Sequence, residues 1–123
     1  MAKKILLVDD SSTARLTSRM IFSSKPNYTL ISACDGKEGV DTATREKPDL
    51  ILMDVVMPRM TGIEACRLLK QQPDTKRIPV ILLTSRGEKD IADEGRAAGC
   101  TDFLTKPVDD DKLVALLKKH LGE

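Results

Sequence analysis

The chain of 123 residues carries 20 lysines and arginines against 19 aspartates and glutamates, a net charge of +1. This balance argues against a general nucleic-acid binder and against a protein held on membranes by basic residues. The length fits a single domain over residues 1–123, long enough to bury about two-thirds of the surface that its unfolded chain exposes. Any charge that matters to function must therefore be gathered locally.

The cysteines are Cys34, Cys66 and Cys100, an odd number with no CxxC pair, which favours neither a disulfide framework nor a zinc site. We expect reduced, packed thiols. No apolar run approaches the roughly 18 residues of a membrane span, and the start of the chain lacks the features of a signal peptide. The sequence thus predicts a soluble, cytoplasmic protein without membrane insertion.

Short apolar runs recur along the chain, and helical stretches separate them. The runs cover residues 4–8, 29–33, 50–53, 80–84 and 102–105. The most apolar of them are continuous rather than alternating, as in parallel strands covered by helices on both faces. Strands alternating with helices through right-handed crossovers predict an α/β fold, a doubly wound five-stranded parallel sheet with five helices.

The first helix is expected after Ser11 or Ser12, either of which can cap it. Its apolar side includes Leu16, Met20 and Ile21, and it ends before the following Lys–Pro pair. The second helix follows the turn at 35–36.

The third helix follows Thr61 and Gly62. Helical spacing assigns inward and outward positions along it. We expect Ile63, Cys66 and Leu69 to be buried, Leu68 at the margin, and Glu64, Arg67 and Lys70 toward water.

The fourth helix, over 88–99, has Ile91 as its only large apolar anchor. It contains Gly95, which costs about 1 kcal/mol relative to alanine. We expect it to be the most mobile helix. The fifth, over 110–121, is amphipathic and ends near His120, which is interpreted as a helix-end residue. Its apolar side comprises Leu113, Leu116, Leu117 and His120 or Leu121.

Chemically capable side chains lie where the predicted strands end. Because ligands bind beyond the carboxyl ends of parallel strands, these side chains are expected at one edge of the sheet. They are Asp9 and Asp10 after the first strand, Asp54 after the third, Thr84 and Ser85 at the fourth, and Lys106 after the fifth. We call Asp9, Asp10 and Asp54 the acidic cup.

Taken singly, each residue has an ordinary structural interpretation. Asp9 and Asp10 could end a strand and cap a helix, Asp54 could belong to a turn, and Thr84 and Lys106 are common at strand ends and surfaces. Their convergence on one edge favours a functional site.

The acidic cup should repel itself. At an effective dielectric constant near 20, two like charges about 4 Å apart repel by roughly 4 kcal/mol. Either a carboxyl group is protonated or a cation lies among them. Lys106 offsets one charge, and oxygen ligands with room for water suit magnesium, Mg²⁺. A divalent ion, a carboxylate, a hydroxyl and a lysine together fit phosphoryl transfer onto that carboxylate.

Several segments resemble the response-regulator receiver domain, and the length resembles its single-domain, CheY-like members. The segments are VDD at 8–10, ACDG at 33–36, DVVMPRMTG at 54–62, TS at 84–85 and FLTKP at 103–107. The resemblance spans essentially the whole chain. It implies a flavodoxin-like fold with strand order 2-1-3-4-5 and a role in a two-component signalling system.

Read through this resemblance, Asp54 is the phosphoacceptor. Asp10 binds Mg²⁺ directly, Asp9 assists through water, and the backbone carbonyl of Val56 completes the protein ligands. The donor is a phosphohistidine on a sensor histidine kinase. The protein is then not an enzyme in the usual sense but a phosphoacceptor that assists its own phosphorylation and dephosphorylation.

The resemblance also implies a switch. Thr84 bonds to the phosphoryl group, Lys106 pairs with it, and Phe103 turns inward, changing the face formed by the fourth helix, fifth strand and fifth helix. The Lys106–Pro107 bond is expected to be cis. Output passes from a monomer to a downstream protein, unless the protein is a phosphate sink or relay.

Two departures from the family pattern affect these expectations. Phe103 stands where such proteins often have tyrosine, so it cannot donate a hydroxyl hydrogen bond, and a core role is as open as a switch role. Val56 cannot orient a water for hydrolysis, whereas Arg86 could cover the phosphate.

Rival functions fit less well. A flavodoxin-like cofactor protein needs a phosphate-binding loop where Asp9 and Asp10 would repel phosphate. An aspartate-nucleophile phosphatase spaces its two aspartates by one residue, whereas these are adjacent. A P-loop nucleotide enzyme is excluded by the absence of GxxxxGK[ST].

Overall fold

The computed structural model describes residues 2–84 and 89–122. Within those ranges, strands and helices alternate strictly along the chain. In order they are β1 (Lys3–Val8), α1 (Ser12–Ser23), β2 (Tyr28–Ala33), α2 (Gly36–Glu46), β3 (Leu50–Asp54), α3 (Gly62–Gln71), β4 (Val80–Thr84), α4 (Lys89–Ala97), β5 (Asp102–Thr105) and α5 (Asp110–Leu121). The expectations for Ser85 and Arg86, and the start of the fourth helix at residue 88, lie outside the described residues.

The strands form one parallel sheet in the order β2-β1-β3-β4-β5, which confirms the predicted fold. The pairing aligns the strand ends: Val8 is paired with Ala33 and with Met53. One residue further along, Asp54 is paired with Leu83. The carboxyl ends of β1, β3 and β4 therefore meet at one edge, where the chain order of the strands reverses between β1 and β3.

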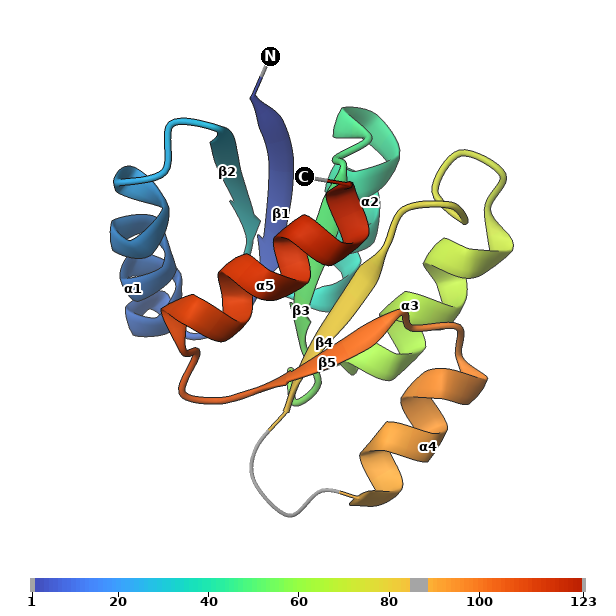
Figure 1. Cartoon of the computed structure of the whole chain (residues 1–123). Helices are drawn as coiled ribbons and strands as arrows, with labels where there is room; N and C mark the ends of the chain where they lie inside the picture. Colours follow the sequence, from blue (N-terminus) through green and yellow to red (C-terminus); the bar gives the residue numbers. More distant parts are fainter. Residues whose placement is uncertain (1, 85–88, 123) are drawn as a thin grey trace.

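Helices cover both faces of the sheet. Helices α1 and α5 lie on one face, and α2, α3 and α4 lie on the other (Figure 1). Alternate residues of the strands point into the two cores, so that Leu6 and Val8 contribute to the α2–α4 side while Ile5 and Leu7 contribute to the α1–α5 side. Both faces being buried explains the continuous apolar runs.

Helix α1 presents a different face to the sheet from the predicted one. Leu16 and Met20 are 53% and 67% exposed, so their predicted burial is wrong. The stripe that faces the sheet instead has small residues in the early turns and large apolar residues in the last one. This stripe comprises Ala14, Ser18, Ile21 and Phe22.

Helix α3 follows its prediction except at one residue. Thr61 and Glu64 form a capping box at its start, and Ile63, Cys66 and Leu69 are buried. Lys70, expected to face water, is half-buried because its ammonium group donates to the carbonyls of residues 76 and 78, at 3.1 and 2.7 Å.

The glycine within α4 has a packing reason. A Cβ atom at Gly95 would lie 2.8 Å from Leu82 Cδ1 and 3.0 Å from the Phe103 ring. Glycine thus lets α4 approach the sheet at a cost in helix propensity. The greater mobility of α4 stays a prediction.

Helix α5 buries Leu113 and Leu117 and partly buries Leu116 and Leu121. Among the residues that the structure describes, none of the helices has the length and apolar character needed to cross a bilayer.

The contrast between α1 and α5 predicts unequal effects on stability. Leu117→Ala removes a fully buried side chain and should lower the free energy of unfolding by about 2–5 kcal/mol. The matched variant Leu16→Ala should change it by less than about 0.5 kcal/mol. Urea unfolding followed by far-ultraviolet circular dichroism measures both, and equal losses would contradict the orientation of α1.

Candidate functional site

The acidic cup forms where β1 and β3 end. Asp9 follows β1 and is 1% exposed, Asp54 is the last residue of β3 and is 9% exposed, and Asp10 is exposed to solvent. Each of the three offers a carboxylate oxygen, and these oxygens lie within 4.8 Å of one another. The sheet register thus gathers residues that are 45 positions apart in the chain.

Lys106 joins the two buried members of the cup. Its Nζ donates to Asp54 Oδ2 at 2.9 Å and to Asp9 Oδ2 at 3.1 Å. Its backbone N–H donates to the carbonyl of Thr84 at 2.7 Å, which holds the end of β5 against β4. The Lys106–Pro107 peptide is cis, as expected.

Asp9 is held from every side. Its N–H donates to the carbonyl of Ala33 at 3.1 Å, and its Oδ1 accepts from the N–H of Ser11 at 3.0 Å. Its carbonyl oxygen accepts from Arg15 Nη1 at 2.7 Å. Ser11 caps α1 through the N–H of Ala14. The serine therefore serves as the cap, and the Asp9 carboxylate faces Lys106 instead.

Burial and charge act on Asp54 in opposite directions. Burial raises the pKa of its carboxyl group most, and the charge of Asp9 adds to this, while the hydrogen bond and charge of Lys106 and the backbone N–H of Val56 lower it. The net result is a raised pKa. For Lys106, burial lowers the pKa, but its bonds and charge interactions with Asp54 and Asp9 together outweigh burial and raise it.

The remaining predicted site residues that the structure describes are Thr84, Val56 and Phe103. Thr84 ends β4, and it is half-buried. Val56 is 67% exposed, and its N–H bonds to the Asp54 carboxylate. Phe103 is half-buried in β5, where its ring packs against the α2–α4 core and lies 5.3 Å from the guanidinium carbon of Arg96.

The donors of the cup fit a hard divalent cation. They are carboxylate oxygens, with no sulfur or imidazole among them, and exposed Asp10 leaves room for water. This chemistry matches Mg²⁺, which is usually held by one or two carboxylates and keeps several waters. A cation there would also relieve the repulsion that Lys106 offsets in part.

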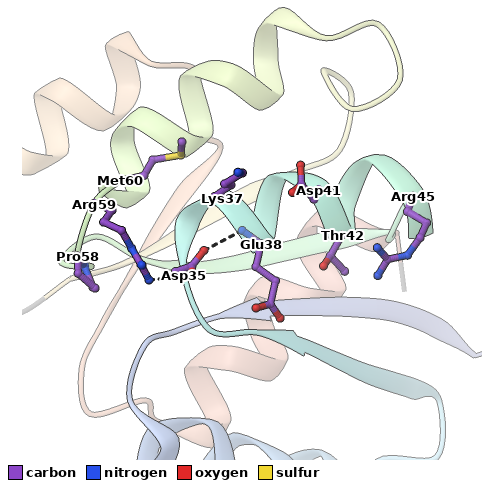
Figure 2. Close-up of a pocket in the computed structure, with 9 residues that line it drawn as sticks. All are labelled: Asp35, Lys37, Glu38, Asp41, Thr42, Arg45, Pro58, Arg59 and Met60. Atoms are coloured by element: carbon purple, nitrogen blue, oxygen red, sulfur yellow. Dashed lines mark hydrogen bonds and ion pairs between the residues drawn. The ribbon is translucent and has the colours of Figure 1, made fainter.

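A second polar region lies beside α2. Here Arg59, in the left-handed region at φ 68°, pairs with Asp35 at 3.3 Å, and Asp35 caps α2 through the N–H of Glu38 (Figure 2). The adjoining hollow of about 590 Å³ includes no residue of the acidic cup. Its cations and carboxylates are evenly matched, so we assign it no chemical role.

Sequence reasoning missed Arg15 and the pair formed by Arg59 and Asp35. Arg15 lies in α1, and Arg59 lies in the segment after β3. Neither sits in a spacing pattern that distinguishes it from a solvated arginine.

A sequence model of the response regulator receiver domain matches residues 5–118. The chain belongs to this family. This membership leaves the flavodoxin-like cofactor protein and the aspartate-nucleophile phosphatase without support. The receiver fold itself is flavodoxin-like in architecture.

Relatives cover the chain almost completely. Protein PilH from Pseudomonas aeruginosa is 40% identical over 97% of this chain and 98% of its own length. Response regulator PleD from Caulobacter vibrioides is 40% identical over 96% of this chain, which spans 26% of PleD.

A solved structure agrees with these relatives. The receiver domain of sensor histidine kinase PA1611 from Pseudomonas aeruginosa PAO1 is 29% identical, covers 100% of both chains and has a TM-score of 0.90. That structure has a magnesium ion coordinated in its active site cleft.

Because the pKa of Asp54 is raised, removing its charge should increase the free energy of unfolding, by an amount that depends on pH. The folded protein binds this proton more tightly than the unfolded chain, so stability falls as pH rises from the ordinary value of 3.8 through the raised pKa. Without divalent metal, Asp54→Asn should therefore be more stable than the unsubstituted protein at neutral pH.

The stability gained by Asp54→Asn should shrink as the pH falls below 3.8, the ordinary pKa of an aspartate. Urea unfolding at several pH values in a chelator measures it. The control Asp74→Asn alters an exposed carboxylate and should show no comparable gain. A stability loss in Asp54→Asn at neutral pH would contradict this account of the cup.

Proposed function

We propose that this receiver domain accepts a phosphoryl group from a phosphohistidine of a sensor histidine kinase onto Asp54, and then signals to a downstream protein. The observation that carries the proposal is Lys106 Nζ, placed 2.9 Å from Asp54 and 3.1 Å from Asp9 in a cup of three carboxylates. This arrangement holds a nucleophilic carboxylate beside the ammonium group of Lys106 and beside carboxylate oxygens that could bind a metal ion.

In the proposed step, an oxygen of the Asp54 carboxylate forms a bond to phosphorus as the P–N bond of the phosphohistidine breaks. The electron pair of that bond returns to the imidazole nitrogen, and Asp54 becomes an acyl phosphate. Lys106, already bonded to Asp54, pairs with the added negative charge, and Thr84 lies on the neighbouring strand end to donate its hydroxyl hydrogen.

When Mg²⁺ is bound, it would neutralise part of the negative charge of the incoming phosphoryl oxygens. We assign Asp10 as its direct ligand, because Asp10 is exposed and the Asp9 carboxylate is engaged by Ser11 and Lys106. Asp9 would act through water. Asp54 and the Val56 carbonyl complete the proposed ligand set.

The output surface is proposed to be the face of α4, β5 and α5. Adjacent residues tie β5 to both flanking helices: Phe103 contacts Arg96 of α4, and Asp102 Oδ2 lies 3.0 Å from His120 Nε2 of α5. Because Lys106 directly follows β5, a movement of Lys106 at the cup would displace the end of this strand. Movement of Phe103 with Thr84 is the proposed switch.

A phosphate sink or relay uses the same chemistry without an output partner, and it remains the second candidate. It differs in one measurable respect. An output protein binds the phosphorylated form more tightly than the unphosphorylated form.

Acetyl phosphate tests the acceptor without a kinase. With Mg²⁺, the protein should gain one phosphoryl group by intact-mass measurement, and Asp54→Asn should gain none. Asp41→Asn, which changes an exposed carboxylate of α2, is the control and should be labelled normally. Equal labelling of Asp54→Asn would move the acceptor elsewhere.

A further inference from the structure

Arg15 reaches back from α1 to the strand end that carries the acidic cup. Its Nη1 lies 2.7 Å from the carbonyl oxygen of Asp9. The β1 ladder ends at Val8, so this carbonyl lies beyond the pairing that satisfies the rest of the strand. A guanidinium donor makes a short, charge-assisted bond there.

That bond fixes more than Asp9. The carbonyl of Asp9 and the N–H of Asp10 belong to one planar peptide unit, so anchoring the first sets the direction in which Asp10 leaves the strand. The side chain of Asp9 is secured by Ser11 and Lys106. Asp10 is exposed, so its placement depends mainly on its backbone.

We propose that Arg15 is a positioning residue for the divalent cation: by holding the Asp9 carbonyl, it presents the Asp10 carboxylate to the cup. This rests on the proposed function, in which Asp10 binds the cation directly. Arg15 itself does not touch the cation.

Arg15 has a second effect of opposite sign. Its guanidinium is a positive charge near the cup, and by charge alone it would weaken the binding of a divalent cation. Removing Arg15 therefore weakens binding if positioning dominates and tightens it if repulsion dominates. The hydrogen bond at 2.7 Å acts directly on the Asp9–Asp10 peptide, and the proposal is that this positioning outweighs the repulsion.

Mn²⁺ serves as the probe, because the signal of the free ion in electron paramagnetic resonance reports binding. Arg15→Met should raise the dissociation constant roughly tenfold, as is typical when a partner supporting a metal ligand is lost. Arg15→Lys, which keeps a charge and a donor, should raise it less. Arg19→Met removes an exposed charge from the same helix and should leave it unchanged.

Hydrogen exchange of the metal-free protein gives an independent readout. Arg15→Met should speed exchange at the amides of Asp10 and Ser11 and leave that of Leu7, inside β1, unchanged. Unchanged exchange at both positions would overturn the proposal, and so would unchanged or tighter Mn²⁺ binding.

Asp10→Asn separates this inference from the proposed function. Equal Mn²⁺ binding by Asp10→Asn and the unsubstituted chain would overturn the proposed cation site and the role of Arg15 with it. Binding that is weakened in Asp10→Asn but unchanged in Arg15→Met would overturn the role of Arg15 alone.

Discussion

The bond pair from Lys106 to Asp9 and Asp54 is the interaction on which the rest of the site depends. It joins residues from the ends of three strands, and its two distances are 3.1 and 2.9 Å. Without an ammonium group there, two carboxylates would lie buried and adjacent with no compensating charge, at a cost of several kcal/mol. With it, the cup retains negative charge and a place for one more cation.

This arrangement places Asp54, the proposed nucleophile, where its charge is destabilising. Burial raises the pKa of Asp54 although Lys106 lowers it, so the ionised carboxylate is less stable in the site than it would be in water. Sites that carry out chemistry commonly keep such shifts. The strained carboxylate and the proposed cation are thus two parts of one electrostatic balance.

Much of the fold could be predicted because apolar runs and caps encode it locally. The sheet follows from five short apolar runs, and convergence of Asp9, Asp54 and Lys106 follows from parallel strands ending at one edge. The stripe of α1 could not be predicted, because Leu16 and Met20 satisfy helical periodicity equally well on the outer face. Which stripe of a helix is buried is decided by the elements that the fold places against it.

The finer site was less accessible to sequence. The hydrogen bond from Arg15 to a backbone carbonyl has no sequence signature. An arginine near the start of a helix looks the same in the sequence whether it makes such a bond or faces solvent. Gly95 was visible only as a local cost to α4. Its reason lies in Leu82 and Phe103, which the sheet brings beneath it.

In the proposed site, a divalent cation that Asp54 helps to bind relieves the charge repulsion in the cup. The most direct measurement is the free energy of unfolding at neutral pH as Mg²⁺ is added to the protein and to Asp54→Asn. The unsubstituted protein should gain stability, by about 2.7 kcal/mol at one hundred times the dissociation constant, while Asp54→Asn gains little. Parallel gains in the two proteins would contradict the account.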